Sequence, residues 1–400
     1  MKKYLIGLLL LLCMVLTACN SESSTETVGA EKANASGNSE DTIKIGMLTA
    51  LSGTAGSYGE STFNSAQLAV NEINANGGLL GKQVEIVKGD SASDPNTANE
   101  QAKSLLTNEK VPALFSQITS ADRNAVRPLF DNSEQLFFYD VLYEGGDYSD
   151  NMFVAGEVPE QQLEPVLPYI MNEYKGSKWY IVGEDYVWPH ETSAVVKEVV
   201  EANNGEVLEE KYVPMGHSDY TSILTSIKAT KPDFISLELN AGAAISFMKQ
   251  FNEFGLAKDI KVIALAVDEN TVEAMGPNAE GLLLSASYFY DMPSDANKTF
   301  TTAYTDTFGE DAPKPNFITM GSYDAVHLWA KAVEEAGSLE IAAVKEKLPT
   351  VSFDGPRGTI QFSADSHHAA LPIFLGEVNN GAVDIVKEFG VIDPSKQGKK

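Results

Sequence analysis

The chain has 400 residues, with 29 Lys and Arg against 56 Asp and Glu, which gives a formal net charge of −27 at pH 7. Such an acidic chain is not expected to bind nucleic acid or an anionic lipid surface, because like charges repel. Without the N-terminal segments described next, about 360 residues remain, which suggests two domains.

The first residues predict a secretory signal peptide over 1–18. Lys2 and Lys3 precede an apolar run from Tyr4 to Leu16. This run is too short for a transmembrane helix, which needs about 20 apolar residues. Residues 16–19, Leu-Thr-Ala-Cys, resemble the bacterial lipobox, in which Cys19 would be lipidated and become the mature N-terminus. A plain signal peptide with a chance cysteine is the alternative.

Residues 19–40 predict a lipidated, disordered tether. Val28 is the only large apolar residue in it, so the segment cannot bury enough apolar surface to offset the entropy lost on ordering. The chain has two cysteines, and Cys13 would leave with the signal. The mature domain would then have no disulfide, no cysteine-based metal site and no thiol nucleophile. No later segment is apolar and long enough to cross a membrane, so the lipid anchor would be the only membrane contact.

From residue 43 to residue 139, segments typical of strands alternate with segments typical of helices. The expected strands cover 43–48, 84–87, 113–115 and 135–139, and the expected helices cover 63–73, a segment that opens at 94–96, and 120–130. Strand and helix in turn imply a parallel sheet with helices on both faces.

The same alternation starts again at residue 179. The expected strands cover 179–183, 206–213, 234–239 and 262–265, and the expected helices cover 190–203, 220–229 and 241–254. The fold class is therefore α/β, with two lobes, each a mostly parallel sheet flanked by helices. We expect lobe 1 at 41–157 with a return segment at 288–350, lobe 2 at 158–287 with a C-terminal segment at 351–391, and a flexible tail at 392–400.

Nothing in the sequence indicates an enzyme or a cofactor. There is no HExxH motif, no GxSxG elbow, no Walker A loop and no GxGxxG after a strand. The adjacent pair His367 and His368 could ligate a metal, but we interpret it as an exposed turn and predict no metal site. An amidase using a serine and a carboxylate is the enzymatic alternative, and no nucleophile–base pair supports it.

A binding site is better supported, because ligands of open parallel sheets lie at the carboxyl ends of the strands. Thr119 and Ser120 follow one expected strand and begin a helix. The free N–H groups and positive dipole end of that helix suit a carbonyl or carboxylate oxygen, and the Ser120 hydroxyl adds a donor. The alternative is that Ser120 is only a helix N-cap.

Two further strand ends carry aromatic and polar residues. Tyr139, Asp140 and Val141 follow an almost wholly apolar strand of lobe 1, and Tyr186 and Trp188 lie in the equivalent loop of lobe 2. Aromatic walls with a few convergent polar groups are typical of clefts for small molecules. Aromatic residues at strand ends are also common in cores, and the three matching positions together favour the cleft.

These features resemble the type I periplasmic binding proteins of branched-chain amino-acid and amide importers. The resemblance spans about residues 41–391 and rests on the segments 45–53, 69–74, 77–82 and 91–95. It implies an extracytoplasmic binding protein that delivers a small polar ligand to an ABC permease in the membrane, and the lipobox-like residues 16–19 would anchor it by lipid. A branched-chain or other small amino-acid binder, and a ligand-sensing lipoprotein without a transport role, are the alternatives.

A narrower resemblance is to the urea-binding proteins of urea importers and to short-chain amide sensors. It rests on Thr119, Ser120, Arg123, Ala125 and Val126, on 138–139 and 143–145, on Asp185, Tyr186 and Pro189, on 210–214 and 216–220, and on 351–354, Pro356 and 358–359. It implies that Ser120, Tyr139 and Tyr186 line a pocket for urea or a short-chain amide.

The chain departs from that pattern at two places. Asp140 stands where those proteins usually have proline, and 241–242 is Ala-Gly where they have Gly-Asp. Amino-acid binders place an acidic residue at that strand end of the second lobe, where this chain has Asn240 and Ala241. Asp140, Asp268 or Glu269 could substitute for it, so Asp140 and Asp268 are included among the expected ligand contacts.

Overall fold

The protein is described by a computed structural model that covers residues 42–131, 133 and 135–397. The predicted signal peptide, the lipidated Cys19 and the tether lie outside the described residues, as do residues 398–400. None of the helices in the described part of the chain is long and apolar enough to span a membrane.

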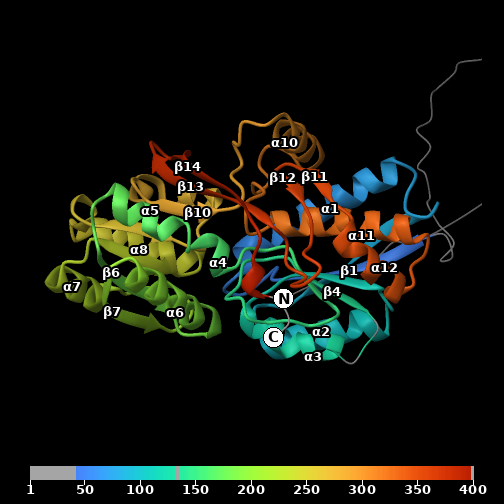
Figure 1. The fold of residues 1–400 in the computed structure, drawn as a ribbon, viewed down its shortest axis with the longest axis horizontal. Coiled ribbons are helices and arrows are strands. Elements are labelled where there is room, and N and C mark those ends of the chain that lie inside the picture. Colours follow the sequence, from blue (N-terminus) through green and yellow to red (C-terminus); the bar gives the residue numbers. More distant parts are fainter. Residues whose placement is uncertain (1–41, 132, 134, 398–400) are drawn as a thin grey trace, which may run out of the picture. The chain divides into compact units, whose positions relative to one another are not determined.

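The first sheet has five parallel strands in the order β2-β1-β3-β4-β5. They are β1 (Thr42–Thr49), β2 (Gln83–Asp90), β3 (Ala113–Gln117), β4 (Leu136–Tyr139) and β5 (Met152–Val154). The helices of this lobe are α1 (Gly59–Ala75), α2 (Pro95–Thr107), α3 (Ser120–Asp131), α10 (Asp295–Phe308), α11 (Met320–Ala336) and α12 (Ile341–Lys347). Figure 1 shows α2 and α3 on one face of the sheet and α1 and α11 on the other. Strands β3, β4 and β5 are buried along their whole length, as expected for a sheet covered on both faces.

The second sheet has seven strands in the order β14-β13-β10-β9-β8-β6-β7. The parallel strands are β6 (Lys178–Glu184), β7 (Glu206–Val213), β8 (Phe234–Glu238), β9 (Lys261–Ala264) and β10 (Leu283–Ala286). The antiparallel strands are β13 (Leu371–Asn379) and β14 (Ala382–Ile392), and a separate hairpin has β11 (Phe353–Gly355) and β12 (Gly358–Ile360). The helices here are α4 (Pro159–Gln162), α5 (Val166–Glu173), α6 (Val187–Ala202), α7 (Thr221–Thr230), α8 (Ala241–Glu253) and α9 (Glu269–Met275).

The chain passes between the two sheets three times, after β5, after β10 and after β12. Arg357, in the turn between β11 and β12, contacts the other two crossings. Its guanidinium donates to the Ala155 carbonyl at 2.9 Å and to the Ser287 hydroxyl at 2.6 Å, and it pairs with Asp324 at 2.6 Å. Both charged side chains are fully buried. One buried ion pair therefore fixes the region where the lobes are joined.

The two-lobed α/β fold is as predicted, and the structure adds detail to the expected elements. Helix α6 begins at Val187 rather than 190, and α4, α5 and β5 fall where no element was expected. Residues 392–397, expected to be a flexible tail, contact the rest of the chain. The Lys396 amide donates to Glu160, and the Gly146 amide donates to the Gln397 side chain at 2.6 Å.

Candidate ligand-binding site

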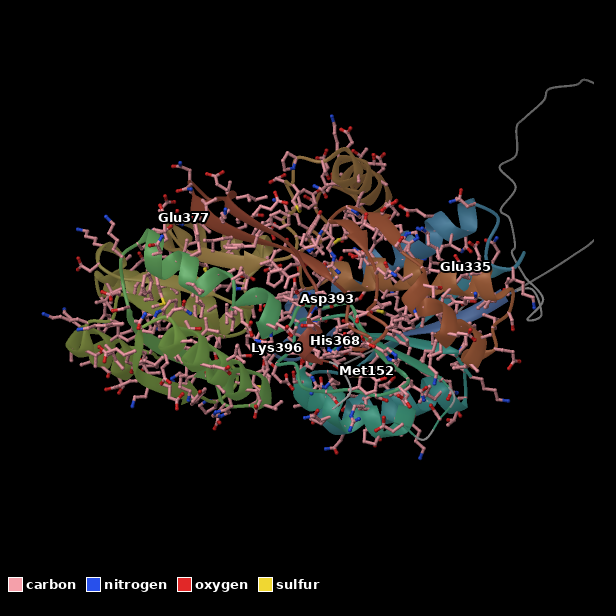
Figure 2. The ribbon with its side chains drawn as sticks, viewed as in Figure 1. Met152, Glu335, His368, Glu377, Asp393 and Lys396 are labelled. Atoms are coloured by element: carbon pink, nitrogen blue, oxygen red, sulfur yellow. The ribbon has the colours of Figure 1, made fainter. Side chains whose placement is uncertain are left out.

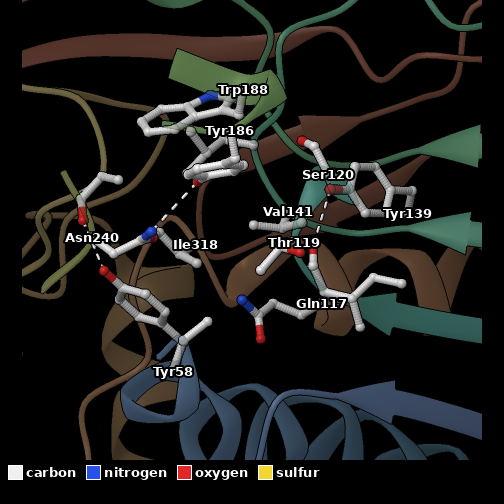
Figure 3. Close-up of a pocket in the computed structure, with 14 residues that line it drawn as sticks. Tyr58, Gln117, Thr119, Ser120, Tyr139, Val141, Tyr186, Trp188, Asn240 and Ile318 are labelled. Carbon is white, nitrogen blue, oxygen red and sulfur yellow. Dashed lines mark hydrogen bonds between the residues drawn. The ribbon is translucent and has the colours of Figure 1, made fainter. Parts of the chain in front are cut away.

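A small cavity lies where the carboxyl ends of strands from both sheets meet. Its lining residues lie at or just after the ends of β1, β3 and β4 in one lobe and of β6, β8 and β9 in the other, except Ile318, which precedes α11 (Figure 3). The fourteen are Ala55, Tyr58, Gln117, Ile118, Thr119, Ser120, Tyr139, Val141, Leu142, Tyr186, Trp188, Asn240, Ala266 and Ile318. Its volume, counted as the space open to the centre of a water molecule, is about 40 Å³. Six of the expected contact residues are in this lining.

The loop after β3 presents Thr119 and Ser120 at the start of α3. Thr119 and Asp122 cap the helix reciprocally, since the Asp122 amide donates to the Thr119 hydroxyl at 3.2 Å and the Thr119 amide donates to the Asp122 carboxylate at 3.3 Å. The Ser120 hydroxyl instead donates to Glu144 at 2.6 Å. The alternative in which Ser120 is only an N-cap is therefore wrong, because Thr119 caps the helix and Ser120 points elsewhere.

Tyr139 ends β4 and is fully buried. Its hydroxyl donates to the Ile118 carbonyl at 2.9 Å, and a carbonyl can only accept, so the position of the phenolic hydrogen is fixed. The Arg123 guanidinium carbon lies 5.3 Å from the centre of the ring. Burial raises the pKa of Tyr139, so the phenol stays neutral at physiological pH.

The wall of the second lobe is built by Tyr186, Trp188 and Asn240. Tyr186 precedes α6 with an extended backbone, and its ring lies 6.2 Å from the Trp188 ring. The Asn240 side-chain amide donates to Glu184 at 2.5 Å. It also donates to the Tyr186 hydroxyl at 3.4 Å (Figure 3). Burial raises the pKa of Tyr186, so this phenol also stays neutral. Asn240 is a lining residue that was not among the expected contacts.

Tyr58, also missed, joins the two lobes across the cavity. Its hydroxyl donates to the Ala266 carbonyl at 2.8 Å and accepts from the Ala241 amide at 3.2 Å. The residue lies in a Gly- and Ser-rich loop after β1, and no periodicity or motif in that loop distinguishes it. Burial raises the pKa of Tyr58, so its hydroxyl keeps its hydrogen.

Asp140 and Asp268, expected as ligand contacts, do not line this cavity, and we correct those two assignments. Asp140 follows Tyr139 and turns away from the cavity under α11, where its carboxylate accepts from the Ser322 hydroxyl at 3.2 Å. Burial raises the pKa of Asp140 well above its ordinary value. Asp268 is the N-cap of α9 and accepts from the Thr271 amide at 3.0 Å and from Asn316 at 2.5 Å. Both carboxylates are therefore used in holding the fold.

The interpretation of His367 and His368 as an exposed turn is wrong. Both side chains are buried. The His367 ring stacks on Phe153 with ring centres 4.3 Å apart, and a His368 ring nitrogen lies 2.6 Å from the Tyr143 hydroxyl. Figure 2 shows His368 near Met152 of β5. The described residues include no group of three His, Cys, Asp or Glu side chains that could hold a metal ion.

The small cavity has a neutral lining that combines apolar side chains with uncharged polar ones. None of its fourteen lining residues is Asp, Glu, Lys, Arg or His. Glu144 and Glu184 lie behind the wall and accept hydrogen bonds from Ser120 and Asn240. Because the Ser120 hydrogen is donated to Glu144 and the Tyr139 hydrogen to the Ile118 carbonyl, the two hydroxyl oxygens could meet a ligand only as acceptors. Tyr186 accepts from Asn240, so its own hydrogen is available to a ligand oxygen.

A larger hollow of about 740 Å³ lies at the opposite end of the first sheet. It is lined by Pro112 and Gln135, which precede β3 and β4, and by residues of α12. Ligands of open α/β sheets bind at the carboxyl ends of the strands. The small cavity is therefore the better candidate in spite of its size.

Comparison with known proteins agrees with the fold. The model of the periplasmic binding protein family matches residues 42–382. Leu/Ile/Val-binding protein homolog 7 of Brucella abortus is 24% identical over 355 residues, which cover 82% of this chain and 86% of that protein. The Leu/Ile/Val-binding protein BraC3 of Rhizobium johnstonii is 25% identical over 322 residues, with coverages of 78% and 84%.

Solved structures show the same architecture. An ABC-transporter solute-binding protein of Rhodopseudomonas palustris BisB5, in complex with 3,4-dihydroxybenzoic acid, superimposes with a TM-score of 0.80 at 26% identity, covering 89% of this chain and 99% of the other. The branched-chain amino-acid binding protein LivJ of Streptococcus pneumoniae, in complex with isoleucine, gives a TM-score of 0.79 at 24% identity, covering 88% and 100%. With its family model matched over both lobes, the chain belongs to the periplasmic binding proteins, which are solute-binding proteins and not enzymes.

Proposed function

We propose that this protein is the extracytoplasmic substrate-binding protein of an ABC importer and binds urea or a short-chain aliphatic amide in the interlobe cavity. The observation that carries the proposal is the lining itself, which is small and holds no ionisable side chain other than neutral tyrosines. The proposed ligand contacts include six residues expected from the sequence, which are Thr119, Ser120, Tyr139, Val141, Tyr186 and Trp188. Three further lining residues are added from the structure, and these are Tyr58, Gln117 and Asn240.

The size of the cavity favours a ligand of a few atoms. A single water needs at least about 10–15 Å³ of such volume, so 40 Å³ holds about three waters or one molecule the size of urea or acetamide. A leucine or a dihydroxybenzoate molecule is much larger. Either of these would require the lobes to separate or the walls to rearrange.

The charge of the lining also favours an uncharged ligand. An amino acid carries an ammonium and a carboxylate, and a benzoate carries a carboxylate. Burying such charges is costly unless each is paired. The carboxylates nearest the wall, Glu144 and Glu184, already accept hydrogen bonds from Ser120, Arg123, Asn240 and the Gly216 amide. An amide can be satisfied by neutral partners alone.

The hydrogen-bond directions suggest how an amide would lie. Its N–H groups would donate to the oxygens of Ser120 and Tyr139 in the first lobe, and its carbonyl oxygen would accept from the Tyr186 hydroxyl of the second lobe. Contacts from both lobes would favour the closed arrangement, because the ligand binds that arrangement more tightly than an open one. A ligand of four heavy atoms gains at most about 6 kcal/mol, so we expect a dissociation constant of about 40 µM or weaker.

A branched-chain or other small amino acid is the second candidate, favoured by the relatives named as Leu/Ile/Val-binding proteins at 24–25% identity. At that identity the fold is retained while the lining can change. This candidate would need an acidic partner for the ammonium group, and neither Asp140 nor Asp268 reaches the cavity.

We further propose that Cys19 carries the lipid anchor and that the closed, ligand-loaded form docks on a membrane permease. A ligand-sensing lipoprotein with the same anchor is the alternative to transport. Metabolic labelling with palmitate should mark the wild type and not Cys19→Ser, which should appear in the medium. Uptake of labelled urea or acetamide by a deletion strain separates transport from sensing.

The ligand class is tested by thermal-shift measurements with urea, acetamide, formamide, isoleucine and benzoate. A ligand that binds only the folded state raises the melting temperature by mass action. We expect urea or an amide to raise it at millimolar concentration and isoleucine and benzoate to have no effect. A shift with isoleucine alone would establish the second candidate instead.

A further inference from the structure

Glu144 lies directly behind the wall of the cavity and is almost fully buried, with 5% of its side chain exposed. One carboxylate oxygen accepts from the Ser120 hydroxyl at 2.6 Å, and the other accepts from the Arg123 guanidinium at 2.7 Å. It is not itself a lining residue. Its direct hydrogen bond to the lining is the one from Ser120.

The Arg123 guanidinium determines which oxygen of the Glu144 carboxylate is left to bond to Ser120. Arg123 is 3% exposed and is packed against the rings of Tyr139 and Tyr143, with its carbon 5.3 Å and 4.7 Å from their centres. A guanidinium only donates hydrogen bonds, so the oxygen facing it must remain an acceptor. The other oxygen is then left for Ser120, and an ionised carboxylate can only accept the Ser120 hydrogen.

We infer that Glu144 determines the specificity of the cavity by positioning the Ser120 hydroxyl, an inference that rests on the proposed function. By holding the Ser120 hydrogen away from the ligand, it leaves the Ser120 oxygen as an acceptor, so that the wall selects a ligand with an N–H donor and rejects an isosteric carboxylate. The Tyr139 oxygen is also left as an acceptor for a ligand N–H, because its own hydrogen is donated to the Ile118 carbonyl. Acetamide and acetate, which have the same shape, are the pair that this wall distinguishes.

Glu144→Gln tests the inference because Arg123 fixes the orientation of the new amide. Its oxygen must face Arg123, so its NH₂ group faces Ser120 and donates to it, and the Ser120 hydrogen is released into the cavity. By calorimetry, acetamide should bind about tenfold or more weakly than to the wild type, because its N–H bond to the Ser120 oxygen is exchanged for a donor–donor contact. The ratio of acetamide to acetate affinity should fall by at least as much.

Asp147→Asn is the matched control. Asp147 also pairs with Arg123, at 3.4 Å, but it does not line the cavity, so this variant removes the same charge without touching Ser120. We expect it to leave the acetamide-to-acetate ratio within about threefold of the wild type, since partly exposed pairs contribute little. In a Ser120→Ala background, Glu144→Gln should no longer change the ratio.

Glu144→Asp keeps the charge and the contact with Arg123 but is too short to reach Ser120 as well, and it should reduce the ratio like Glu144→Gln. It also replaces Glu144→Gln if that variant fails to fold. Equal ratios for Glu144→Gln, Asp147→Asn and the wild type would overturn the inference while amide binding stands. Failure of the wild type to bind urea, acetamide or formamide would overturn the proposed function and the inference with it.

Discussion

The hydroxyl of Tyr58 donates a hydrogen bond of 2.8 Å to the carbonyl of Ala266, and so joins the loop after β1 to the loop after β9. The same oxygen accepts from the Ala241 amide at the start of α8. One neutral phenol thus links the first lobe to two strand ends of the second. These bonds exist only when the lobes are together, so they stabilise the closed arrangement.

Tyr58→Phe should therefore weaken ligand binding without changing the chemistry of the other walls. Two hydrogen bonds of about 0.5–1.5 kcal/mol each are lost, so we expect about 5- to 150-fold weaker binding of the preferred amide by calorimetry. Small-angle scattering of the unliganded variant should give a larger radius of gyration than the wild type. An unchanged affinity and an unchanged radius would contradict a latching role.

Tyr186→Phe should remove the donor that we assign to the ligand carbonyl. The expected result is about tenfold weaker amide binding, at the upper end for one neutral hydrogen bond, with a melting temperature close to that of the wild type. Tyr212→Phe is the matched control, because Tyr212 is in the same lobe and bonds to Glu210 on the surface at 3.2 Å. Equal affinities for the two variants would remove Tyr186 from the site.

Arg357→Met should strongly destabilise the protein. The variant leaves Asp324 as an uncompensated buried charge where the lobes are joined, and breaking a fully buried pair costs about 3–5 kcal/mol. Chemical denaturation measures the loss. Arg127→Met, which breaks partly exposed pairs with Asp131 and Asp147, should cost less than about 1 kcal/mol. Similar losses for the two variants would show that the joining region does not depend on the Arg357 pair.

Glu238 predicts a specific pH dependence of stability. It is fully buried at the end of β8, accepts from Ser193 at 2.7 Å and Ser236 at 3.0 Å, and burial raises its pKa from the ordinary 4.5 to about 8. The folded state binds this proton more tightly than the unfolded state. The contribution of protonated Glu238 to the free energy of unfolding is therefore complete below pH 4.5 and is lost as the pH rises toward 8.

Glu238→Gln should remove that contribution. The difference in unfolding free energy between the wild type and the variant, measured from pH 4.5 to 8, should move steadily against the wild type as the pH rises. Glu269, whose pKa burial also raises to about 8, remains in both proteins and cancels in the difference. A difference that does not change with pH would mean that Glu238 is ionised in the folded protein.

The sequence predicted much of the fold because strands covered on both faces are continuous apolar runs. Phe137 and Phe138, inside β4, are buried together with both ends of that strand, and such runs alternating with helical segments leave few architectures open. The strand ends also predicted Ser120, Tyr139 and Tyr186 as lining residues, because ligands of open α/β sheets lie at the carboxyl ends of the strands.

The remaining residues depend on contacts that no local pattern encodes. Asp140 lies next to Tyr139, and its side chain is covered by a contact with Ser322, which is 182 positions away in the sequence. Tyr58 is similar, because its partners are 183 and 208 positions away. His368 looks like an exposed turn residue in the sequence, and only its contact with Tyr143 in the folded protein shows that it is buried.

The most direct test is a crystal structure of the protein grown with acetamide. We predict one amide in the interlobe cavity, with its nitrogen within hydrogen-bond distance of the Ser120 and Tyr139 oxygens and its carbonyl oxygen against the Tyr186 hydroxyl. A cavity that excludes the amide, or that opens around an amino acid paired with a carboxylate, would contradict the assignment.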